Sequence, residues 1–230
     1  MAQRRFSPKS KPMKKCIILV GPSAVGKTTV AHAMLEMGDK YELVRSVTTR
    51  EMRADSFGSE YIYISREEFL HQIEVGGVLE HTEYAGQLYG TPRSEIDRIT
   101  SEGRVPLLIL DLNGANSLYH AEGISPCTVY LYDELDVMEE RLRARYISEN
   151  TSEADQKRYD SRTKQNLVDF SKMEEYESFI YSFVKNCATV ECCAKKIDEV
   201  YDIFALDTPK NAEETKTVAE ALAASAKAKM

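Results

Sequence analysis

The chain has 230 residues, 43% of them hydrophobic, and a formal net charge of −7 at pH 7. Its length allows one well-buried domain with small appendages, and its apolar content is that of a soluble globular protein. No apolar stretch has the length of a membrane span, and the acidic balance argues against a broad nucleic-acid surface. We therefore expect a cytoplasmic protein without membrane or nucleic-acid partners, either a monomer or a homodimer.

The N-terminal segment, the cysteines and the histidines indicate no special chemistry. Residues 1–13 are polar and basic, and the apolar run 16–20 that follows is too short for the core of a signal peptide. We predict a disordered arm over 1–13. The five cysteines match no zinc or redox spacing, so we expect reduced, partly buried thiols. The four histidines are scattered and suggest no metal site.

Residues 21–29, with the sequence GPSAVGKTT, contain the strongest motif of the chain. They fit G-x-x-x-x-G-K-[ST], with a strand-like run before and a helical pattern after, which is the context that this motif requires. Such a loop turns backbone N–H groups inward, and the following helix adds its positive end, so phosphate oxygens bind there. Lys27 would reach the β- and γ-phosphates, and the Thr28 hydroxyl would bind Mg²⁺. The alternative is a strand–helix turn that binds no ligand. The ATP-binding residues that we expect are Gly21, Ser23, Ala24, Val25, Gly26, Lys27, Thr28 and Thr29.

After this loop the chain alternates between strand-like and helical segments. Ser65 and Glu68 form a capping box, and Thr91 followed by Pro92 predicts a second helix start. Residues 105–111 are an almost uninterrupted apolar run ending in Asp111, as in a central parallel strand covered on both faces. We predict strands over 41–47, 60–65, 78–84, 105–111, 128–132 and 182–184, and helices after Gly26 and over 65–75, 91–103, 133–145, 158–176 and 195–204.

Two later segments lack such patterns. Residues 146–157 are polar, which predicts a loop. Residues 207–230 are rich in Ala, Glu, Lys and Thr, with few large apolar side chains, so we predict a flexible C-terminal tail. The alternating strands and helices between the phosphate loop and this tail predict an α/β domain with a parallel sheet.

Several further motifs, together with the phosphate loop, resemble the guanylate kinase family. The resemblance runs in order from about Lys14 to Phe204, most of the chain. Separate motifs at compatible spacing are far more specific than a phosphate loop alone. The motifs are SVTTR at 46–50, VLEH at 78–81, LYGTP at 88–92, LDLNGA at 110–115 and ERLRAR at 140–145.

The resemblance implies a P-loop NTPase fold: three layers, a central parallel sheet, an inserted GMP-binding domain and a mobile lid. It places the core at 14–45 and 94–206, the GMP-binding insert at 46–93 and the lid at about 145–162. The implied activity is transfer of the ATP γ-phosphoryl group to GMP, giving GDP and ADP, with Mg²⁺ accompanying ATP.

The resemblance also assigns site residues. The GMP phosphate would meet Arg50, Arg53, Tyr61 and Tyr89, and the guanine would meet Glu80, Thr91 and Asp111, with Ser46 nearby. Residue chemistry agrees, because guanidinium groups bind two phosphate oxygens at once, and a carboxylate such as Glu80 accepts both guanine donors, N1–H and NH₂. Besides Lys27, the catalytic residues on the ATP side would be among Arg141, Arg145, Arg158 and Arg162.

The chain also departs from the family pattern. Ile109 stands where the family usually has the first of two carboxylates, and the segment 54–58 is one residue shorter than usual, with Asp55 an approximate substitute for a GMP-binding glutamate. The lid after Arg145 is several residues longer. Two alternatives therefore stay open: a related kinase acting on another nucleoside monophosphate or a ribosyl phosphate, and a non-catalytic interaction module. The intact phosphate loop argues against the module.

Overall fold

The computed structural model describes residues 13–51, 61–84, 86–186 and 189–230. Arg53, Asp55 and nearly all of the predicted arm 1–13 lie outside these residues. None of the helices in the described part combines the length and the apolar character that a membrane crossing needs.

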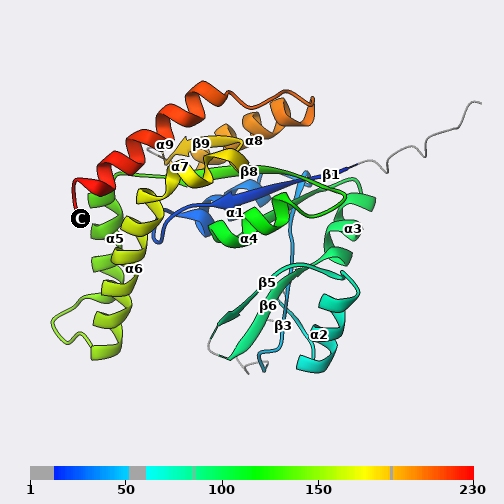
Figure 1. Ribbon diagram of the computed structural model, residues 1–230, viewed down its shortest axis with the longest axis horizontal. Coiled ribbons are helices and arrows are strands. Elements are labelled where there is room, and N and C mark those ends of the chain that lie inside the picture. The colour runs from blue at the N-terminus through cyan, green and yellow to red at the C-terminus, as the bar shows by residue number, and fades with distance from the viewer. Residues whose placement is uncertain (1–12, 52–60, 85, 187–188) are drawn as a thin grey trace, which may run out of the picture.

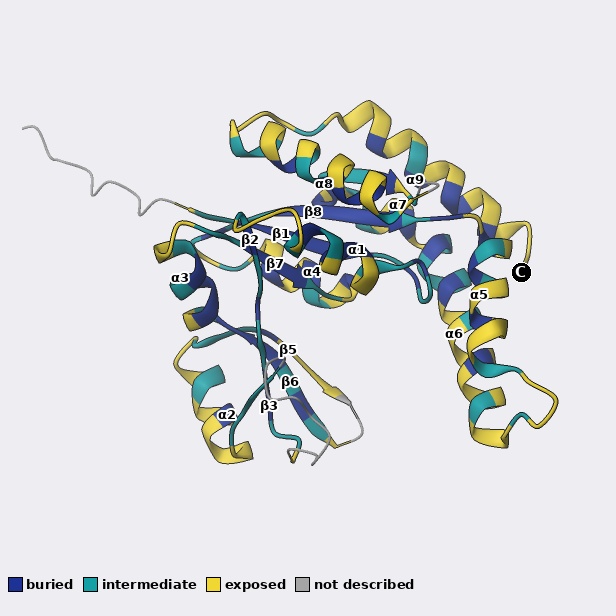
Figure 2. Cartoon of the chain, turned by 180° about the vertical axis from the view of Figure 1, so that it is seen from behind, coloured by how far each residue is buried: buried dark blue, intermediate teal, exposed yellow. Residues whose placement is uncertain are grey.

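The core is a five-stranded parallel sheet in the order β2-β7-β1-β8-β9. The residues 16–20 of its central strand are fully buried, so both faces of the sheet are covered, as Figure 2 shows in dark blue. The α/β fold class predicted from the sequence is thereby confirmed. The strands are β1 (Lys14–Val20), β2 (Tyr41–Leu43), β7 (Val105–Ile109), β8 (Ile124–Tyr132) and β9 (Ser182–Lys185).

Four helices pack on this sheet, and the first and last of them also pack against each other: α1 (Lys27–Leu35), α3 (Arg93–Ser101), α4 (Leu112–Tyr119) and α8 (Val190–Ala205). Helix α8 begins five residues before the predicted start because the side chain of Thr189 caps it, accepting a hydrogen bond from the N–H of Cys192 at 3.2 Å. Its buried side includes Cys193, Ala194 and Ile197.

A second, smaller sheet lies on one side of the core (Figure 1). Its strands have the order β4-β3-β6-β5, and it has its own small core of Val47, Phe69 and Leu88. The helix start predicted at Ser65 is confirmed: the Ser65 hydroxyl accepts from the N–H of Glu68 at 3.0 Å, and Glu68 Oε1 accepts from Gln72 Nε2 at 2.7 Å. The elements are β3 (Ser46–Thr48), β4 (Tyr61–Tyr63), α2 (Arg66–Glu74), β5 (Val78–Tyr84) and β6 (Gln87–Pro92).

The single strand predicted over 41–47 is instead two strands in different sheets. β2 ends at Leu43 in the core sheet, and β3 begins at Ser46 in the second sheet. A continuous β-like sequence cannot reveal this change of sheet, because both halves have the same residue preferences.

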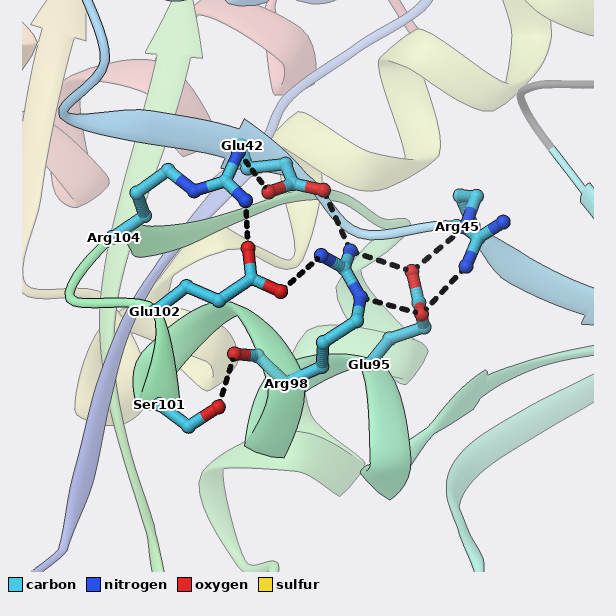
Figure 3. A network of polar contacts seen from close by, with 7 residues as sticks. All are labelled: Glu42, Arg45, Glu95, Arg98, Ser101, Glu102 and Arg104. Atoms are coloured by element: carbon cyan, nitrogen blue, oxygen red, sulfur yellow. Dashed lines mark hydrogen bonds and ion pairs between the residues drawn. The ribbon is translucent and has the colours of Figure 1, made fainter.

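A network of ion pairs connects the segment that leads from the core sheet to the second sheet with the helix that leads back (Figure 3). Glu95, at the start of α3, is buried and accepts hydrogen bonds from Arg45 Nε and Nη2, both at 2.9 Å. Arg98 bonds the same carboxylate and also reaches Glu42 on β2 at 2.6 Å. The hydrogen bonds from Arg45, helped by those from Arg98, lower the pKa of Glu95 to about 2. The segment that leaves the core is thus tied to the helix that returns to it.

We expect Glu95→Gln to lower the free energy of unfolding by about 1–3 kcal/mol, because two arginines lose a buried charged acceptor. The folded-state pKa of Glu95 lies below its usual 4.5, so its stabilisation is present above that value and is lost as the pH falls from 4.5 towards about 2. Urea denaturation at pH 7 and pH 3 should show the variant's deficit shrinking at the lower pH. The exposed Glu102→Gln is the control, with a clearly smaller deficit at pH 7, because exposed ion pairs contribute little. Equal deficits in both variants would contradict the prediction.

Helices α5 (Leu135–Tyr146) and α6 (Glu153–Ser171) form a hairpin that projects from the core on the same side as the second sheet (Figure 1). The loop predicted over 146–157 is wrong for its second half, where α6 has already begun. The Ser152 hydroxyl caps α6 by accepting from the N–H of Asp155 at 3.1 Å, and Lys157 pairs with Glu153 one turn earlier at 2.6 Å. A polar helical turn such as this shows no apolar periodicity, so a helix could not be predicted here from the sequence pattern.

The flexible tail predicted over 207–230 is also wrong. Helix α9 (Ala212–Lys227) packs along α6 and the short helix α7 (Met173–Tyr176). Its buried side consists mainly of small residues, Ala219, Ala223 and Ala226, with Leu222 among them. Close approach of an alanine face buries a helix without the large apolar residues that the prediction required. The 3₁₀ turn η1 (Glu177–Phe179) joins this contact through Glu177, which accepts from Lys210 and from the Thr215 hydroxyl, both at 2.7 Å.

Leu222→Ala should therefore lower the free energy of unfolding by about 2–4 kcal/mol, because it removes a buried side chain from the face of α9 that meets the rest of the protein. Leu206, which is 81% exposed, provides the matched control, and Leu206→Ala should change stability by no more than about 0.5 kcal/mol. Chemical denaturation of both variants makes the comparison. If both variants changed the free energy of unfolding equally little, the packing of α9 would be contradicted and the prediction of a flexible tail would stand.

Candidate active site

The phosphate loop joins β1 to α1, and two glycines shape it. Gly21 has φ 147°, and a Cβ there would lie 2.2 Å from the carbonyl oxygen of Leu131 on β8, so no side chain fits. Gly26 has φ 102° and stands at the start of α1. Ala24, between them, also has a positive φ, 64°, which costs a non-glycine residue energy. The loop is therefore held in a conformation that its sequence only partly favours.

Lys27 occupies the first turn of α1. Its Nζ donates to the carbonyl oxygens of Gly21 at 2.7 Å and Pro22 at 2.9 Å. Burial lowers the pKa of Lys27 to about 8, and the negative charge of Asp169 on α6 opposes that shift. The ammonium group thus keeps its proton at pH 7 although it is mostly removed from water.

A cavity of about 480 Å³ opens over the loop. The hairpin α5–α6 contributes Arg141, Arg145 and Arg162 to its lining. Arg162 Nη1 lies 3.3 Å from the Ser23 hydroxyl, and Arg141 pairs with Asp133 at 3.1 Å. The remaining lining residues are Ser23, Ala24, Gly26, Lys27, Thr28, Thr29, Val30, Asn186 and Val190.

Arg158, the fourth arginine expected from the sequence, is placed differently. Its Nη1 donates to Asp155 at 2.9 Å within the exposed first turns of α6, and its side chain is 64% exposed. Arg162 lies one turn further along the same helix and faces the loop. The structure therefore brings three of the four expected arginines to the loop and leaves Arg158 at the surface.

A second cavity, of about 260 Å³, lies where the core meets the second sheet. Ser46, Tyr61 and Thr91 line it from the second sheet, and Ile109 lines it from the end of β7. Thr28 lines both this cavity and the one over the phosphate loop. The two cavities therefore share Thr28 as a lining residue. The other lining residues are Ala31, His32, Leu35, Leu43, Val44, Leu108 and Leu110.

Glu80 and Thr91 form a buried polar pair on neighbouring strands of the second sheet. The Thr91 hydroxyl donates to Glu80 Oε1 at 2.6 Å instead of capping the next helix, which begins at Arg93. Burial raises the pKa of Glu80 above its usual value, and the hydrogen bond from Thr91 opposes the shift. Gly114 of α4 keeps this space open, since a Cβ there would lie 3.1 Å from Glu80 Oε2.

Asp111 stands at the start of α4 and caps it, with Oδ1 accepting from the N–H of Gly114 at 2.7 Å. Its side chain is exposed, and its charge adds to the rise of the pKa of Glu80. Glu80, Thr91 and Asp111, which the family resemblance assigns to the guanine, thus lie close together.

Arg50 follows β3 and is surrounded by tyrosines. Its guanidinium carbon lies 5.2 Å from the ring centre of Tyr61, and Nη2 donates to the hydroxyl of Tyr63 at 3.4 Å. Tyr89 meets Tyr61 edge to face at 6.1 Å. Arg50 Nε is buried and has no acceptor among the described residues. Tyr63 was not expected from the sequence, although its place in an alternating strand beside Tyr61 could have suggested it.

Sequence reading also missed Asn166 and Asn186. Asn186 follows β9, and its Nδ2 donates to the carbonyl oxygen of Val25 at 2.7 Å. Asn166 lies on α6 and bonds Ser23. No motif of the sequence links either asparagine to a loop more than a hundred residues away.

Comparisons with known proteins agree on one family. Residues 13–201 match the model of the family described as guanylate kinase. The guanylate kinase of Lactococcus lactis subsp. lactis is 31% identical over 81% of this chain and 86% of its own length. The guanylate kinase of Prochlorococcus marinus is 30% identical over 77% of this chain and 91% of its length.

A solved structure supports the fold. The crystal structure of guanylate kinase from Anaplasma phagocytophilum aligns with a TM-score of 0.58 and 24% identity, covering 88% of this chain and 90% of that one. The match of residues 13–201 to the family model, together with the two relatives at 30–31% identity, shows that the chain belongs to the guanylate kinase family.

Proposed function

We propose that this protein transfers the γ-phosphoryl group of ATP to GMP, giving ADP and GDP. The observation that carries the proposal is the meeting of the two cavities at Thr28. One cavity has a phosphate loop and arginines; the other adjoins the elements that carry Arg50, Glu80 and Asp111. A donor in the first and an acceptor in the second would bring their phosphates together, and such alignment supplies much of the rate enhancement in a two-substrate transfer.

On the donor side, ATP would occupy the cavity over the phosphate loop. Lys27, protonated at pH 7, would balance charge on the β- and γ-phosphates, and Arg141, Arg145 and Arg162 would stabilise charge that develops during transfer. Arg162 contacts the Ser23 hydroxyl and Arg141 pairs with Asp133, and these two contacts hold both arginines near the loop.

Mg²⁺ fits this site as a partner of ATP. The Thr28 hydroxyl is a hard oxygen donor on the first turn of α1, and Mg²⁺ commonly keeps several waters and relies on substrate phosphates. The described residues contain no cluster of three or more His, Cys, Asp or Glu side chains that could hold a metal without a nucleotide. When bound, Mg²⁺ would neutralise charge on the phosphates of ATP.

On the acceptor side, we assign the inserted domain 46–93 to GMP. Arg50, Tyr61 and Tyr89 would hold its phosphate, with Arg53 expected to join them. Glu80 would accept the guanine donors, helped by Thr91, Asp111 and Ser46. The attacking phosphate oxygen is already largely ionised at pH 7, since its second pKa is near 6, so the reaction requires no general base.

We further propose that residues 145–162, the tip of the α5–α6 hairpin, act as a lid. This segment carries Arg145 and Arg162 at its two ends, so a movement of the tip would change how tightly both arginines surround the transferring phosphate. Closure over the bound nucleotides would exclude water, which otherwise competes with GMP as acceptor.

The placement of the arginines gives a first test. Arg162→Ala should lower kcat by about two to three orders of magnitude, because it removes a cation that faces the phosphate loop. Arg158→Ala, four residues away on the same helix, should change kcat less than about threefold, because Arg158 pairs with Asp155 at the surface. Steady-state rates of ADP formation measure both. A larger loss for Arg158→Ala would contradict this assignment.

The acceptor is tested with Glu80→Gln. The glutamine oxygen can still accept from Thr91, which turns its NH₂ group towards the guanine donors. Such an opposed polar pair in a closed site costs roughly 1–3 kcal/mol, so kcat/KM for GMP should fall by about one to two orders of magnitude while KM for ATP stays nearly constant.

Glu83→Gln is the matched control, because Glu83 lies on the same strand with an exposed side chain and should leave GMP kinetics within about twofold. Transfer is measured with GMP, AMP and a ribosyl phosphate as competing acceptors. If the wild type preferred AMP or the ribosyl phosphate, and Glu80→Gln left that preference unchanged, the guanine assignment would be lost.

A further inference from the structure

Asn166 bonds Ser23 of the phosphate loop through both ends of its side-chain amide. The N–H of Ser23 donates to Asn166 Oδ1 at 2.7 Å, and Asn166 Nδ2 donates to the carbonyl oxygen of Ser23 at 3.1 Å. Asn166 is 3% exposed. One side chain thus satisfies the donor and the acceptor of the same backbone residue, and this fixes the orientation of both adjoining peptide planes.

Ala24, which follows Ser23, has a strained backbone conformation. Ala24 has φ 64°, in the left-handed region, which glycine enters freely and alanine enters at a cost. The loop therefore needs an outside restraint to keep this conformation. Among the described residues, the carbonyl of Ala24 has only a 3.5 Å contact with Arg141 Nη1, whereas the backbone of Ser23 immediately before it is bonded twice.

Asn166 is supported by a well-packed part of the molecule. Phe170, one turn further along α6, is 1% exposed in the main core, and α9 packs along the same helix. Arg162, one turn before Asn166, lines the cavity and reaches the Ser23 hydroxyl. Residues four apart share a helix face, so one face of α6 both presents Arg162 and holds the loop.

We propose that Asn166 is a positioning residue for the phosphate loop: it holds Ser23 so that Ala24 keeps its left-handed conformation and the loop is ready for the triphosphate. Asn166 acts through Ser23 and does not touch the nucleotide. The inference rests on the proposed function only in naming ATP as the ligand of the loop.

The test compares Asn166→Ala in two backgrounds, the wild type and Ala24→Gly, with ATP affinity measured by calorimetry in the presence of Mg²⁺. In the wild-type background, Asn166→Ala should raise the Kd for ATP about tenfold, the effect of two lost hydrogen bonds. In the Ala24→Gly background the penalty should be at least about threefold smaller, because glycine adopts the required φ without restraint. KM for GMP should change less than about twofold in both backgrounds.

Two further variants keep the test decisive. Asn166→Leu, which keeps the branching of the asparagine side chain without its polar atoms, replaces Asn166→Ala if the alanine variant does not fold. Ser171→Ala, at the end of the same helix, is the control and should leave the Kd for ATP within about twofold.

An unchanged Kd for ATP, or an equal penalty in the wild-type and Ala24→Gly backgrounds, would overturn the proposal, because loss of packing alone would not depend on the residue at position 24. A different result would refute the proposed function. If the wild-type protein bound ATP but did not phosphorylate GMP, the proposed function would be wrong, and the role of Asn166 could still be tested through the Kd for ATP.

Discussion

A phosphate loop turns its backbone N–H groups inward, and the same turn leaves backbone carbonyls that other parts of the protein must bond. In this chain those partners come from distant elements. The side chain of Asn166 bonds the backbone N–H and C=O of Ser23, and the side chain of Asn186 bonds the backbone carbonyl of Val25. An unpaired buried carbonyl costs about 1–3 kcal/mol, so the shape of the loop depends on where α6 and the end of β9 are held. The packing of α9 along α6 is therefore connected to the phosphate site, although α9 lies beyond the residues that match the family.

The parallel topology explains why the functional segments meet. The carboxyl ends of β1, β2, β7 and β8 lie at one edge of the core sheet, because all pairings among them are parallel. The phosphate loop follows β1, the inserted domain follows β2, Asp111 follows β7, and the α5–α6 hairpin follows β8. Four chain segments far apart in sequence thus reach one edge, and the Arg45–Glu95 network holds the longest excursion in place.

The sequence predicts most of the fold because the relevant signals are local. The phosphate loop, the Ser65 cap and the buried strand β7 each depend on neighbouring residues. The failures have a different origin: α9 is buried through an alanine face, and the first turns of α6 are polar, so neither shows an apolar pattern. Within the site, the roles of Arg158 and Arg162 could not be separated, since the face of α6 that meets the loop is set by tertiary packing. Asn166 could not be found for the same reason.

The electrostatics of the site bear on the role of Ile109. The chain carries a net charge of −7, so the three arginines at the donor cavity must offset an unfavourable overall field. An uncharged residue at 109 removes one negative charge from the wall of the acceptor cavity, close to where two phosphates would meet. Glu80 is buried and accepts hydrogen bonds from Thr91, which lines the same cavity. In the proposed assignment, its remaining acceptor positions would receive guanine N1–H and NH₂. Adenine would leave these acceptors unpaired, and a buried unpaired carboxylate discriminates more strongly than a missing apolar contact. In the proposed assignment, selection of guanine would therefore follow from the burial of Glu80, without a second carboxylate at position 109.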